Sequence, residues 1–262
     1  MAVQYASPHL CASASTRAHS SGFPLRALWW GMCGRFTNQF TWRELVELYR
    51  ITEPYIGPIS NLQPRFNFAP MQTGVVIRLD KEGRREPAMM RWGLVPSWAK
   101  DDLAGAKCIN AKAETVADKP SFRAAFKSRP CLVPADGFYE WAKLSGGEKQ
   151  PWFITTKDKE PFAFAGLWEW WRRKDAPADA PGVETFAILT TGPNTLCAPI
   201  HDRMPVILAR EEWPRWLAAP EDRKALLARE SFPAERMECR PVGRAVGNVR
   251  NDLPELIERV AS

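Results

Sequence analysis

The sequence contains a long succession of short β-rich runs, separated by turn-forming residues, and few segments with a helical pattern. The runs are residues 74–79, 131–134, 138–143, 151–156, 162–168, 185–191 and 205–209. Ser145-Gly146-Gly147 supplies a hairpin turn between two of them. Many short strands with few helices are typical of a mixed, mainly antiparallel α+β domain. The sequence therefore predicts this fold class.

Helix signals are confined to a small number of segments. Thr41 and Glu44 have capping-box spacing at the start of TWRELVELYR (41–50), where apolar residues recur on one helical face. The other expected helices are residues 119–127, the proline-interrupted stretch 210–230, and residues 254–260. Residues 172–183, rich in Pro, Ala and Asp, are expected to form a surface loop between strands.

Residues 1–31 differ from the rest of the chain. They hold two basic side chains and no acidic one, are rich in Ala and Ser, and show no strand or helix periodicity. Transit peptides share this composition, but the uninterrupted apolar stretch of a secretory signal is missing. A further interpretation is that translation starts at Met32. We expect residues 1–31 to lie outside the core and a single domain to cover residues 32–262, because no convincing linker divides that part.

Charge and composition limit the classes of function. The 36 Lys and Arg against 30 Asp and Glu give a net charge of +6, a mild bias that permits an anionic partner without requiring one. The six cysteines form no C-x-x-C pair and only three histidines are present, which argues against a zinc site, so no metal or cofactor is expected. No stretch approaches the roughly 20 apolar residues that span a bilayer. Free thiols in a reducing compartment are therefore expected.

Cys33 is the cysteine whose position indicates chemistry, because it directly follows Met32. Removal of Met32 would leave Cys33 with a free α-amine beside its thiol. An α-amine has a pKa of about 7.7–8 against about 10.4 for lysine, so its neutral fraction at pH 7 is larger by roughly two to three orders of magnitude. The amine can form a Schiff base with an aldehyde, and the thiol can then close a five-membered thiazolidine ring. The remaining cysteines of the domain are expected to be structural.

Three further residues are candidates for this chemistry, and each has a plain structural alternative. His201 lies in a polar cluster directly ahead of an apolar run and is the one histidine outside residues 1–31, but it could be a solvated loop residue. Glu140 lies among aromatic residues, where a carboxylate either pairs with a base or has a raised pKa suited to proton transfer. Asn110 could act in the site or simply cap a turn.

The sequence has twelve tryptophans, most of which must belong to the core. RWGLVPSW (91–98) is too irregular to bury both of its tryptophans, Trp92 and Trp98, with ease. Exposed aromatic rings beside cations form a stacking surface for unpaired bases, each worth about 1–3 kcal/mol. The alternative is that both rings lie in the core.

Taken together, these segments resemble the SOS response-associated peptidase (SRAP) family, whose members are also called abasic-site processing proteins. The matching motifs occur in order from Met32. They are MCGRF (32–36), PRFNFAP (64–70), RWGLVPSW (91–98), INAKAET (109–115), KPSFRAAF (119–126), CLVPADGFYEW (131–141), FAFAGLWE (162–169), LTTGPN (189–194), IHDRMPVIL (200–208) and VGNVRNDLPELI (246–257). The resemblance implies a barrel-like, mainly antiparallel sheet with a few flanking helices.

The resemblance also implies a function and a set of site residues. It implies a DNA-damage protein that binds single-stranded DNA and crosslinks covalently to abasic sites. The implied catalytic residues are Cys33, Asn110, Glu140 and His201. The implied DNA-binding residues are Arg35, Trp92, Lys112 and Arg203. Lys112 departs from the arginine expected there, and a lysine meets a phosphate as a point charge without bidentate geometry.

In the implied mechanism, the Cys33 amine attacks the ring-opened aldehyde and the thiol closes a thiazolidine. His201 would assist ring opening, Glu140 would move protons at the amine, and Asn110 would orient the nucleophile. The family's peptidase name refers to release of the residue before the cysteine, and a Schiff base that fails to close predicts weak lyase activity. A monomer in the cytoplasm, associated with the nucleoid, is expected.

Two alternatives from other functional classes remain open at this point. A cysteine hydrolase could use Cys33, His201 and Asn110 as nucleophile, base and orienting group, and would act with residues still attached before Cys33. A noncovalent single-strand-binding module would show salt-sensitive binding that Cys33→Ala leaves intact, with no adduct on abasic DNA.

Overall fold

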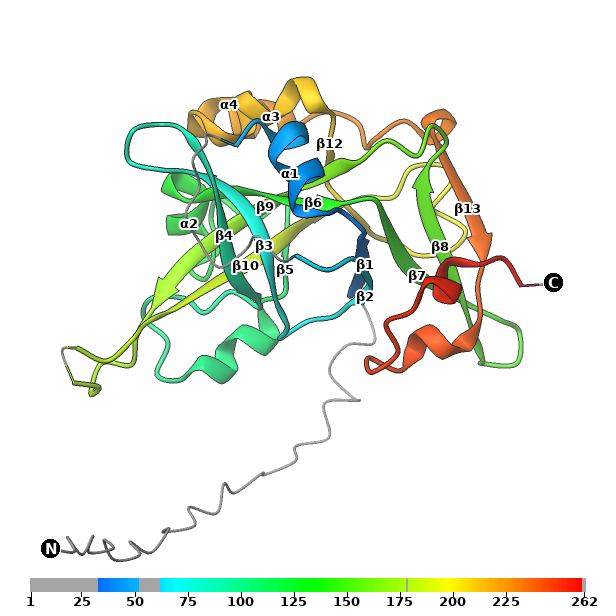
Figure 1. The fold of residues 1–262 in the computed structure, drawn as a ribbon, viewed down its shortest axis with the longest axis horizontal. Helices are drawn as coiled ribbons and strands as arrows, with labels where there is room; N and C mark the ends of the chain where they lie inside the picture. Colours follow the sequence, from blue (N-terminus) through cyan, green and yellow to red (C-terminus); the bar gives the residue numbers. More distant parts are fainter. Residues whose placement is uncertain (1–32, 52–61, 178, 261–262) are drawn as a thin grey trace, which may run out of the picture.

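The structure is a computed structural model, and it describes residues 33–51, 62–177 and 179–260. Strands predominate over helices (Figure 1). The strands are β1 (Arg35–Asn38), β2 (Arg65–Phe68), β3 (Thr73–Leu79), β4 (Arg85–Trp92), β5 (Asn110–Lys112), β6 (Pro130–Ala135), β7 (Gly137–Lys143), β8 (Lys149–Thr156), β9 (Phe162–Trp171), β10 (Val183–Thr191), β11 (Met204–Pro205), β12 (Ile207–Leu208) and β13 (Met237–Pro241). The α-helices are α1 (Trp42–Tyr49), α2 (Arg123–Ser128), α3 (Trp213–Leu217) and α4 (Pro220–Leu227).

A closed barrel forms the centre of the domain. Strand β10 pairs with β9 on one side and with β4 on the other, and β3 and β6 complete the circuit β10-β4-β3-β6-β9. All of these pairings are antiparallel except the parallel pairing of β10 with β4. Strand β5 adds to β10, also in parallel. The predicted α+β domain with a barrel-like, mainly antiparallel sheet is therefore confirmed.

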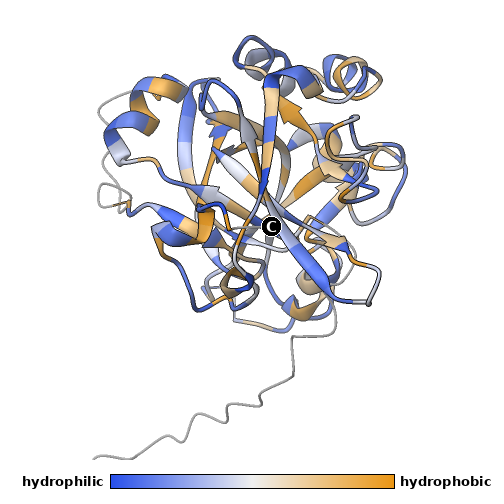
Figure 2. Cartoon of the chain, turned by 90° about the vertical axis from the view of Figure 1, so that its right-hand side faces the viewer, coloured by the Kyte–Doolittle hydropathy of each residue, from blue (hydrophilic) through white to orange (hydrophobic). Residues whose placement is uncertain are grey.

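Alternating side chains give the barrel two apolar faces. Ala165 and Ala187 belong to the cluster that packs against helices α1 and α3, whereas their neighbours Phe164 and Phe186 belong to a second cluster. This alternation follows from the two-residue repeat of a strand, which sends successive side chains to opposite faces. Figure 2 shows hydrophobic residues on strands in the middle of the domain, together with hydrophilic ones. Phe164 also contacts the second sheet, because its ring lies 5.7 Å from that of Phe36.

A second, five-stranded sheet has the order β13-β8-β7-β1-β2. The β7–β8 hairpin surrounds the predicted turn at residues 145–147. Strand β1 lies between β7 and the edge strand β2, on the side of this sheet that is nearer the barrel (Figure 1). This junction is where the candidate site is found.

The helices agree with the sequence in part. Helix α1 has the predicted capping box, in which Thr41 accepts from the Glu44 amide and the Glu44 carboxylate accepts from the Thr41 amide. Helix α2 begins later than predicted, at Arg123, because the chain before it forms turns. The prolines of the 210–230 stretch stand at the starts of α3 and α4, where a missing amide hydrogen costs nothing.

Two expected elements differ from the structure. The last predicted helix is only a 3₁₀ turn, η7 (Pro254–Ile257), because the chain beyond it extends and bridges from Arg259 to Val242. The predicted strand over 205–209 is divided, since β11 pairs with β10 while β12 pairs with β9. Residues 1–31, predicted to lie outside the core, fall outside the described part of the chain.

The sequence predicts free thiols, no membrane span and no metal site. The described cysteines, Cys33, Cys108, Cys131, Cys197 and Cys239, are all free. Within the part of the chain that the structure describes, no helix is long and apolar enough to cross a bilayer. The described residues also contain no group of three or more His, Cys, Asp or Glu side chains that could hold a metal ion.

Replacement of Thr41 tests the capping box of α1. Thr41→Ala removes the side-chain acceptor for the Glu44 amide, and we expect it to lower the free energy of unfolding by about 1 kcal/mol. Thr41→Ser retains the hydroxyl and should stay close to the unsubstituted protein. Urea unfolding followed by circular dichroism measures both variants, and equal stability of the two would contradict a role for the hydroxyl.

Candidate active site

Strand pairing brings Cys33 next to Glu140. Arg35 of β1 pairs with Tyr139 of β7 in antiparallel register, so the chain just before Arg35 continues alongside Glu140. The side chains lie close together there, so that the Glu140 carboxyl group raises the pKa of the Cys33 thiol. Both residues are buried, with exposed fractions of 4% for Cys33 and 2% for Glu140.

Asn110 and the loop after β10 reach Cys33 from the barrel. Asn110 starts β5 and pairs with Ile188 of β10. Its side-chain Nδ2 donates a 2.8 Å hydrogen bond to the carbonyl oxygen of Cys33. The Cys33 Sγ lies 3.7 Å from the carbonyl oxygen of Arg203, to which it donates. The site therefore joins four segments that are far apart in the sequence.

Burial controls the electrostatics of the thiol and the carboxyl group. Removal from water raises the pKa of Glu140 to about 8, and the negative Asp202 nearby adds to the increase. Burial also raises the pKa of the Cys33 thiol, and the adjacent Glu140 raises it further. At neutral pH the favoured state is therefore a neutral carboxylic acid beside a neutral thiol, and only the ionised fraction of Glu140 can accept the thiol proton.

His201 lies in the loop between β10 and β11, with its side chain 17% exposed. Its Nδ1 accepts a 3.0 Å hydrogen bond from the Arg203 amide, which is the arrangement of a neutral ring with its proton on Nε2. The carboxylate of Asp202 lies 3.2 Å from the same nitrogen and could accept a hydrogen bond from it if that nitrogen carried a proton. Nδ1 also lies 3.2 Å from the carbonyl oxygen of Arg203.

Arg203 and Lys112 lie on either side of Glu114. The guanidinium of Arg203 forms a bidentate ion pair with Glu114, at 2.7 and 2.9 Å, and donates to the Thr190 carbonyl at 2.6 Å. This pairing lowers the pKa of Glu114, and the exposed Lys112 lowers it further. Strand register places Lys112 opposite Thr190. Two cations and one carboxylate therefore stand together at the edge of the site.

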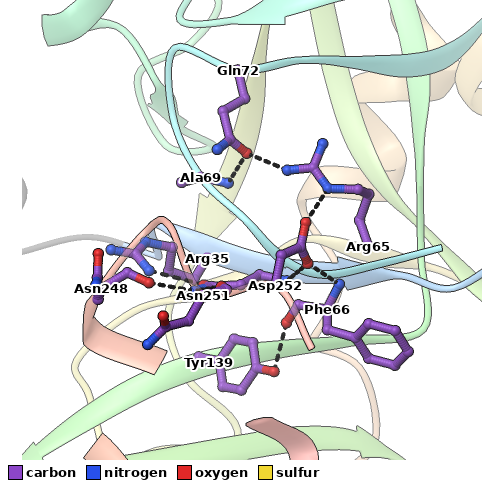
Figure 3. A network of polar contacts seen from close by, with 10 residues as sticks. Arg35, Arg65, Phe66, Ala69, Gln72, Tyr139, Asn248, Asn251 and Asp252 are labelled. Carbon is purple, nitrogen blue, oxygen red and sulfur yellow. Dashed lines mark hydrogen bonds and ion pairs between the residues drawn. The ribbon is translucent and has the colours of Figure 1, made fainter. Parts of the chain in front are cut away.

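Arg35 belongs to a network that attaches the C-terminal segment to β1 and β2 (Figure 3). Its NH1 donates to Asn67 Oδ1 at 2.8 Å and to the Val246 carbonyl at 2.7 Å, and its NH2 donates to the Gly247 carbonyl at 3.2 Å. Burial lowers the pKa of Arg35 to about 10. Arg35 therefore has a structural role in the folded protein.

Two other side chains complete this attachment. The Asn67 amide group donates to the carbonyl oxygens of Val246, Asn248 and Asn251. Asp252 accepts from the backbone amides of Phe66 and Asn67 and pairs with Arg65, as Figure 3 shows for the labelled residues. The irregular segment after β13 is held by these side-chain contacts, because it has few backbone ladder bonds of its own.

Unsatisfied polar atoms gather at Cys33. Among the described residues, six buried side-chain nitrogen or oxygen atoms lack a hydrogen-bond partner, and these include Glu140 Oε1, Asn110 Oδ1 and Arg203 Nε. All three belong to residues that contact Cys33 through a side chain or a backbone carbonyl. Since buried polar groups are normally paired, such a concentration is a sign of a site whose partners come from a substrate.

Most of the chain, including Cys33, Asn110, Glu140 and His201, matches a known protein family. A family model described as SOS response associated peptidase (SRAP) matches residues 32–249. The chain belongs to the SRAP family.

Individual relatives agree with this assignment. The abasic site processing protein YoqW of Bacillus subtilis is 42% identical over 231 residues, covering 87% of this chain and 99% of the relative. YedK of Escherichia coli, also named as an abasic site processing protein, is 33% identical over 239 residues, covering 87% of this chain and all of the relative. A crystal structure of a Bacteroides thetaiotaomicron protein is similar with a TM-score of 0.72 and 27% identity, covering 86% of this chain and all of that chain.

The SRAP fold places the two tryptophans of RWGLVPSW very differently. Trp92, predicted from the resemblance to wedge against bases, is 1% exposed, packs on Phe36 and donates from Nε1 to the Ile109 carbonyl at 2.8 Å. It offers no face to a base in this structure, so we correct that prediction: Trp92 is a core residue. Trp98 is 56% exposed and is the ring of this segment that faces solvent.

Sequence reasoning missed several residues of the SRAP site. Glu114 lies in the motif INAKAET and is not among the predicted site residues, although its acidic side chain two positions after Lys112 is visible in the sequence. Cys197 is expected to be structural, yet burial and Glu140 raise its pKa to about 12, so it lies near the site. Asn67 and Asp252 also lie in family motifs, and only the three-dimensional structure shows what they hold together.

The raised pKa of Glu140 predicts how stability depends on pH. The folded protein keeps a proton on Glu140 up to about pH 8, while the unfolded chain loses it near the ordinary value of 4.5. Because the folded state binds more protons between these values, the free energy of unfolding falls as pH rises from about 4.5 to about 8. Glu140→Gln should flatten this decrease and make the variant relatively more stable at pH 8.

Urea unfolding at several pH values between about 5 and about 8, where the folded and unfolded chains differ in protonation of Glu140, measures the effect. Glu148→Gln is a matched control, since Glu148 is exposed and paired with Arg244, which lowers its pKa out of this range. A Glu140→Gln variant with the same pH slope as the control would show that Glu140 is ionised in the folded protein.

Proposed function

We propose that this SRAP protein forms a covalent thiazolidine crosslink with abasic sites in single-stranded DNA through Cys33. The single observation that carries the proposal is the contact between the Cys33 thiol and a buried, neutral Glu140, inside a cluster of polar atoms that lack partners. The family and the names of the relatives, which are abasic site processing proteins, support the same substrate.

Crosslinking requires a free amine on Cys33, which needs release of the residues before it. In the proposed autopeptidase step, Sγ adds to the carbonyl carbon of the preceding residue and the Cys33 nitrogen leaves as the amine. Water then hydrolyses the thioester, which regenerates the thiol. The ionised fraction of Glu140, which grows as pH approaches its pKa of about 8, can take the thiol proton and return it to the leaving nitrogen. Translation from Met32 would leave a single residue to remove.

The crosslink itself needs two additions to one carbon and the loss of one water. The amine adds to C1′ of the ring-opened sugar to give a carbinolamine, and loss of water gives the imine. Sγ then adds to the same carbon while its proton passes to the nitrogen, closing the five-membered ring. With a pKa of about 8, Glu140 is mostly protonated at neutral pH and can donate to the departing hydroxyl group. Its carboxylate can then accept the proton of the thiol.

Asn110 and His201 take supporting roles in this scheme. Asn110 holds the Cys33 carbonyl at 2.8 Å, which fixes the direction in which the amine and thiol face. His201 stands on the same loop as Arg203, whose carbonyl contacts Sγ, and its Nε2 proton is available for opening of the sugar ring. An imine that escapes ring closure would undergo β-elimination, so weak abasic-site lyase activity accompanies the proposal.

The DNA backbone is proposed to pass over the cations beside Cys33. Lys112 is exposed and Arg203 is already oriented by its pairing with Glu114, which a phosphate would share or replace. Arg35 is proposed as a third contact, although three carbonyl or amide oxygens already occupy its guanidinium. Trp98 takes the stacking role that was expected of Trp92, because its ring is exposed. We place this activity on chromosomal DNA in the cytoplasm and expect a monomer.

A denaturing gel tests the crosslink. Protein expressed from Met32 is incubated with single-stranded DNA that carries one abasic site, and we expect a slower band that survives denaturation. Cys33→Ala should abolish the band, because it removes the thiol that closes the ring. An undiminished band from this variant, or no band from the unsubstituted protein, would overturn the proposal.

The same assay separates the two rival functions. A protein with a residue permanently attached before Cys33 should give no crosslink, because its nitrogen is an amide, whereas a cysteine hydrolase would remain active on peptides. A binding module without covalent chemistry would retain salt-sensitive DNA binding and give no band with any variant.

Substitution of the proton-transferring residues should slow the reaction and spare binding. Glu140→Gln and His201→Ala are expected to reduce the rate of adduct formation by about 10²–10⁴-fold, the range for loss of general acid or base catalysis. Affinity for DNA with a reduced, unreactive abasic site should change little, and fluorescence anisotropy measures it. Loss of binding along with rate would assign these residues a structural role.

A further inference from the structure

Trp170, near the end of β9, is 47% exposed although the next residue, Trp171, is buried. Its ring lies against Gly182, where an added Cβ would come within 2.2 Å of Nε1. The guanidinium of Arg172 lies 5.8 Å from the ring centroid. The glycine backbone and the cation hold the ring in one orientation while the remainder of its surface faces solvent, which is an arrangement suited to stacking.

A second exposed ring, Trp98, belongs to a segment that contacts the end of β9. Trp171 Nε1 donates a 2.9 Å hydrogen bond to the Ala99 carbonyl, and both residues share a small apolar cluster with Val95. Trp98 and Trp170, both exposed, directly precede the two residues of this contact in the sequence. Figure 1 shows the end of the β9–β10 hairpin beside the segment that contains the 3₁₀ helix η3 (Asp102–Lys107).

Basic side chains are interleaved with the two rings. Arg172, Arg173 and Lys174 follow Trp171 directly, and an exposed Lys100 follows Ala99. Arg173 pairs with Asp175 at 2.6 Å. Lysine is depleted at the centre of protein interfaces, whereas aromatic rings alternating with cations are typical of surfaces that bind single-stranded nucleic acid. The chemistry of this surface therefore favours a polynucleotide over a protein.

The strand register connects this surface to the candidate active site. Glu184 of β10 pairs with Trp170, and Ile188 of the same strand pairs with Asn110, the residue that holds Cys33. Four residues of strand separate these positions, about 13 Å at a rise of about 3.3 Å per residue. Single-strand-binding folds cover about 4–16 nucleotides, so a strand bound at Cys33 is long enough to reach Trp170.

We propose that Trp170, with Arg172 and Lys174, binds the nucleotides on one side of the lesion and so extends the DNA-binding surface along β10. The proposal rests on the proposed function, since it takes Cys33 as the point where the abasic sugar is held. It adds a direction to DNA binding: one flank of the lesion contacts this surface and the other does not.

Fluorescence anisotropy with unreactive abasic DNA tests the proposal, because this DNA cannot form a covalent adduct. Two single strands carry the lesion at opposite ends, one with about eight nucleotides on its 5′ side and one with about eight on its 3′ side, within the usual site sizes. Trp170→Ala should weaken binding to one of these strands by roughly five- to tenfold and leave the other unchanged. Gly182→Ala, which displaces the ring without removing it, should weaken the same strand.

Further variants separate stacking, charge and folding. Replacing Arg172 and Lys174 with Ala should reduce the salt dependence of binding to that same strand by about one to two counterions, because fewer phosphates are then neutralised by the protein. Leu144→Ala is the control for removal of an exposed apolar side chain, on the β7–β8 hairpin, and should change neither strand. Equal weakening of both strands by Trp170→Ala, or no weakening of either, would overturn the proposal.

The outcome is independent of the crosslinking chemistry. If the unsubstituted protein binds both strands but forms no adduct with a reactive abasic site, the proposed function fails and the binding surface stands. If it forms the adduct and Trp170→Ala changes neither strand, only the extended surface fails.

Discussion

The pairing of β10 with both β9 and β4 is the constraint on which the rest of the structure depends, because it closes the barrel. A closed sheet leaves no free edge, and its strands cannot slide relative to one another without breaking every ladder. The same strand also carries β5 in parallel, so the position of Asn110 is determined by barrel closure. The loop after β10 delivers His201 and Arg203 to the site from a rigid base.

The second sheet brings the other half of the site against this base. Register between β1 and β7 aligns the start of the domain with Glu140, and the network of Arg35, Asn67 and Asp252 fastens the C-terminal segment behind β1. Cys33 is thus held from both sides, by Asn110 from the barrel and by Glu140 from the sheet. Cys33, the first described residue, is therefore positioned by residues of the barrel and of the second sheet.

The sequence predicts local features well and long-range ones only through the family resemblance. The capping box of α1, the hairpin at residues 145–147 and the β-rich runs all have signals within a few neighbouring residues, and all were confirmed except the run 205–209, which is divided between β11 and β12. Strands β1 and β5 were not predicted, because each is very short and gains its stability from a partner distant in sequence. Trp92 was misplaced for a similar reason, since Gly93 and the prolines around it suggested exposure while the phenylalanines that bury it lie elsewhere in the chain.

The buried polar atoms without partners at this site lower the stability of the fold, and a bound substrate could offset that loss. A carboxyl group with 2% exposure and an oxygen without a partner reduces the stability of the fold, and a hydrophobic side chain of similar size would avoid that loss. Asn110 Oδ1 and Arg203 Nε carry the same kind of cost nearby in the site. A phosphate held at Arg203 would accept from Nε, a protonated Glu140 could donate to an aldehyde oxygen, and Asn110 Oδ1, which only accepts, would need a donor such as a sugar hydroxyl group. A ligand that pairs all three atoms must therefore offer acceptors and a donor, and an abasic nucleotide carries a phosphate, an aldehyde and a hydroxyl group.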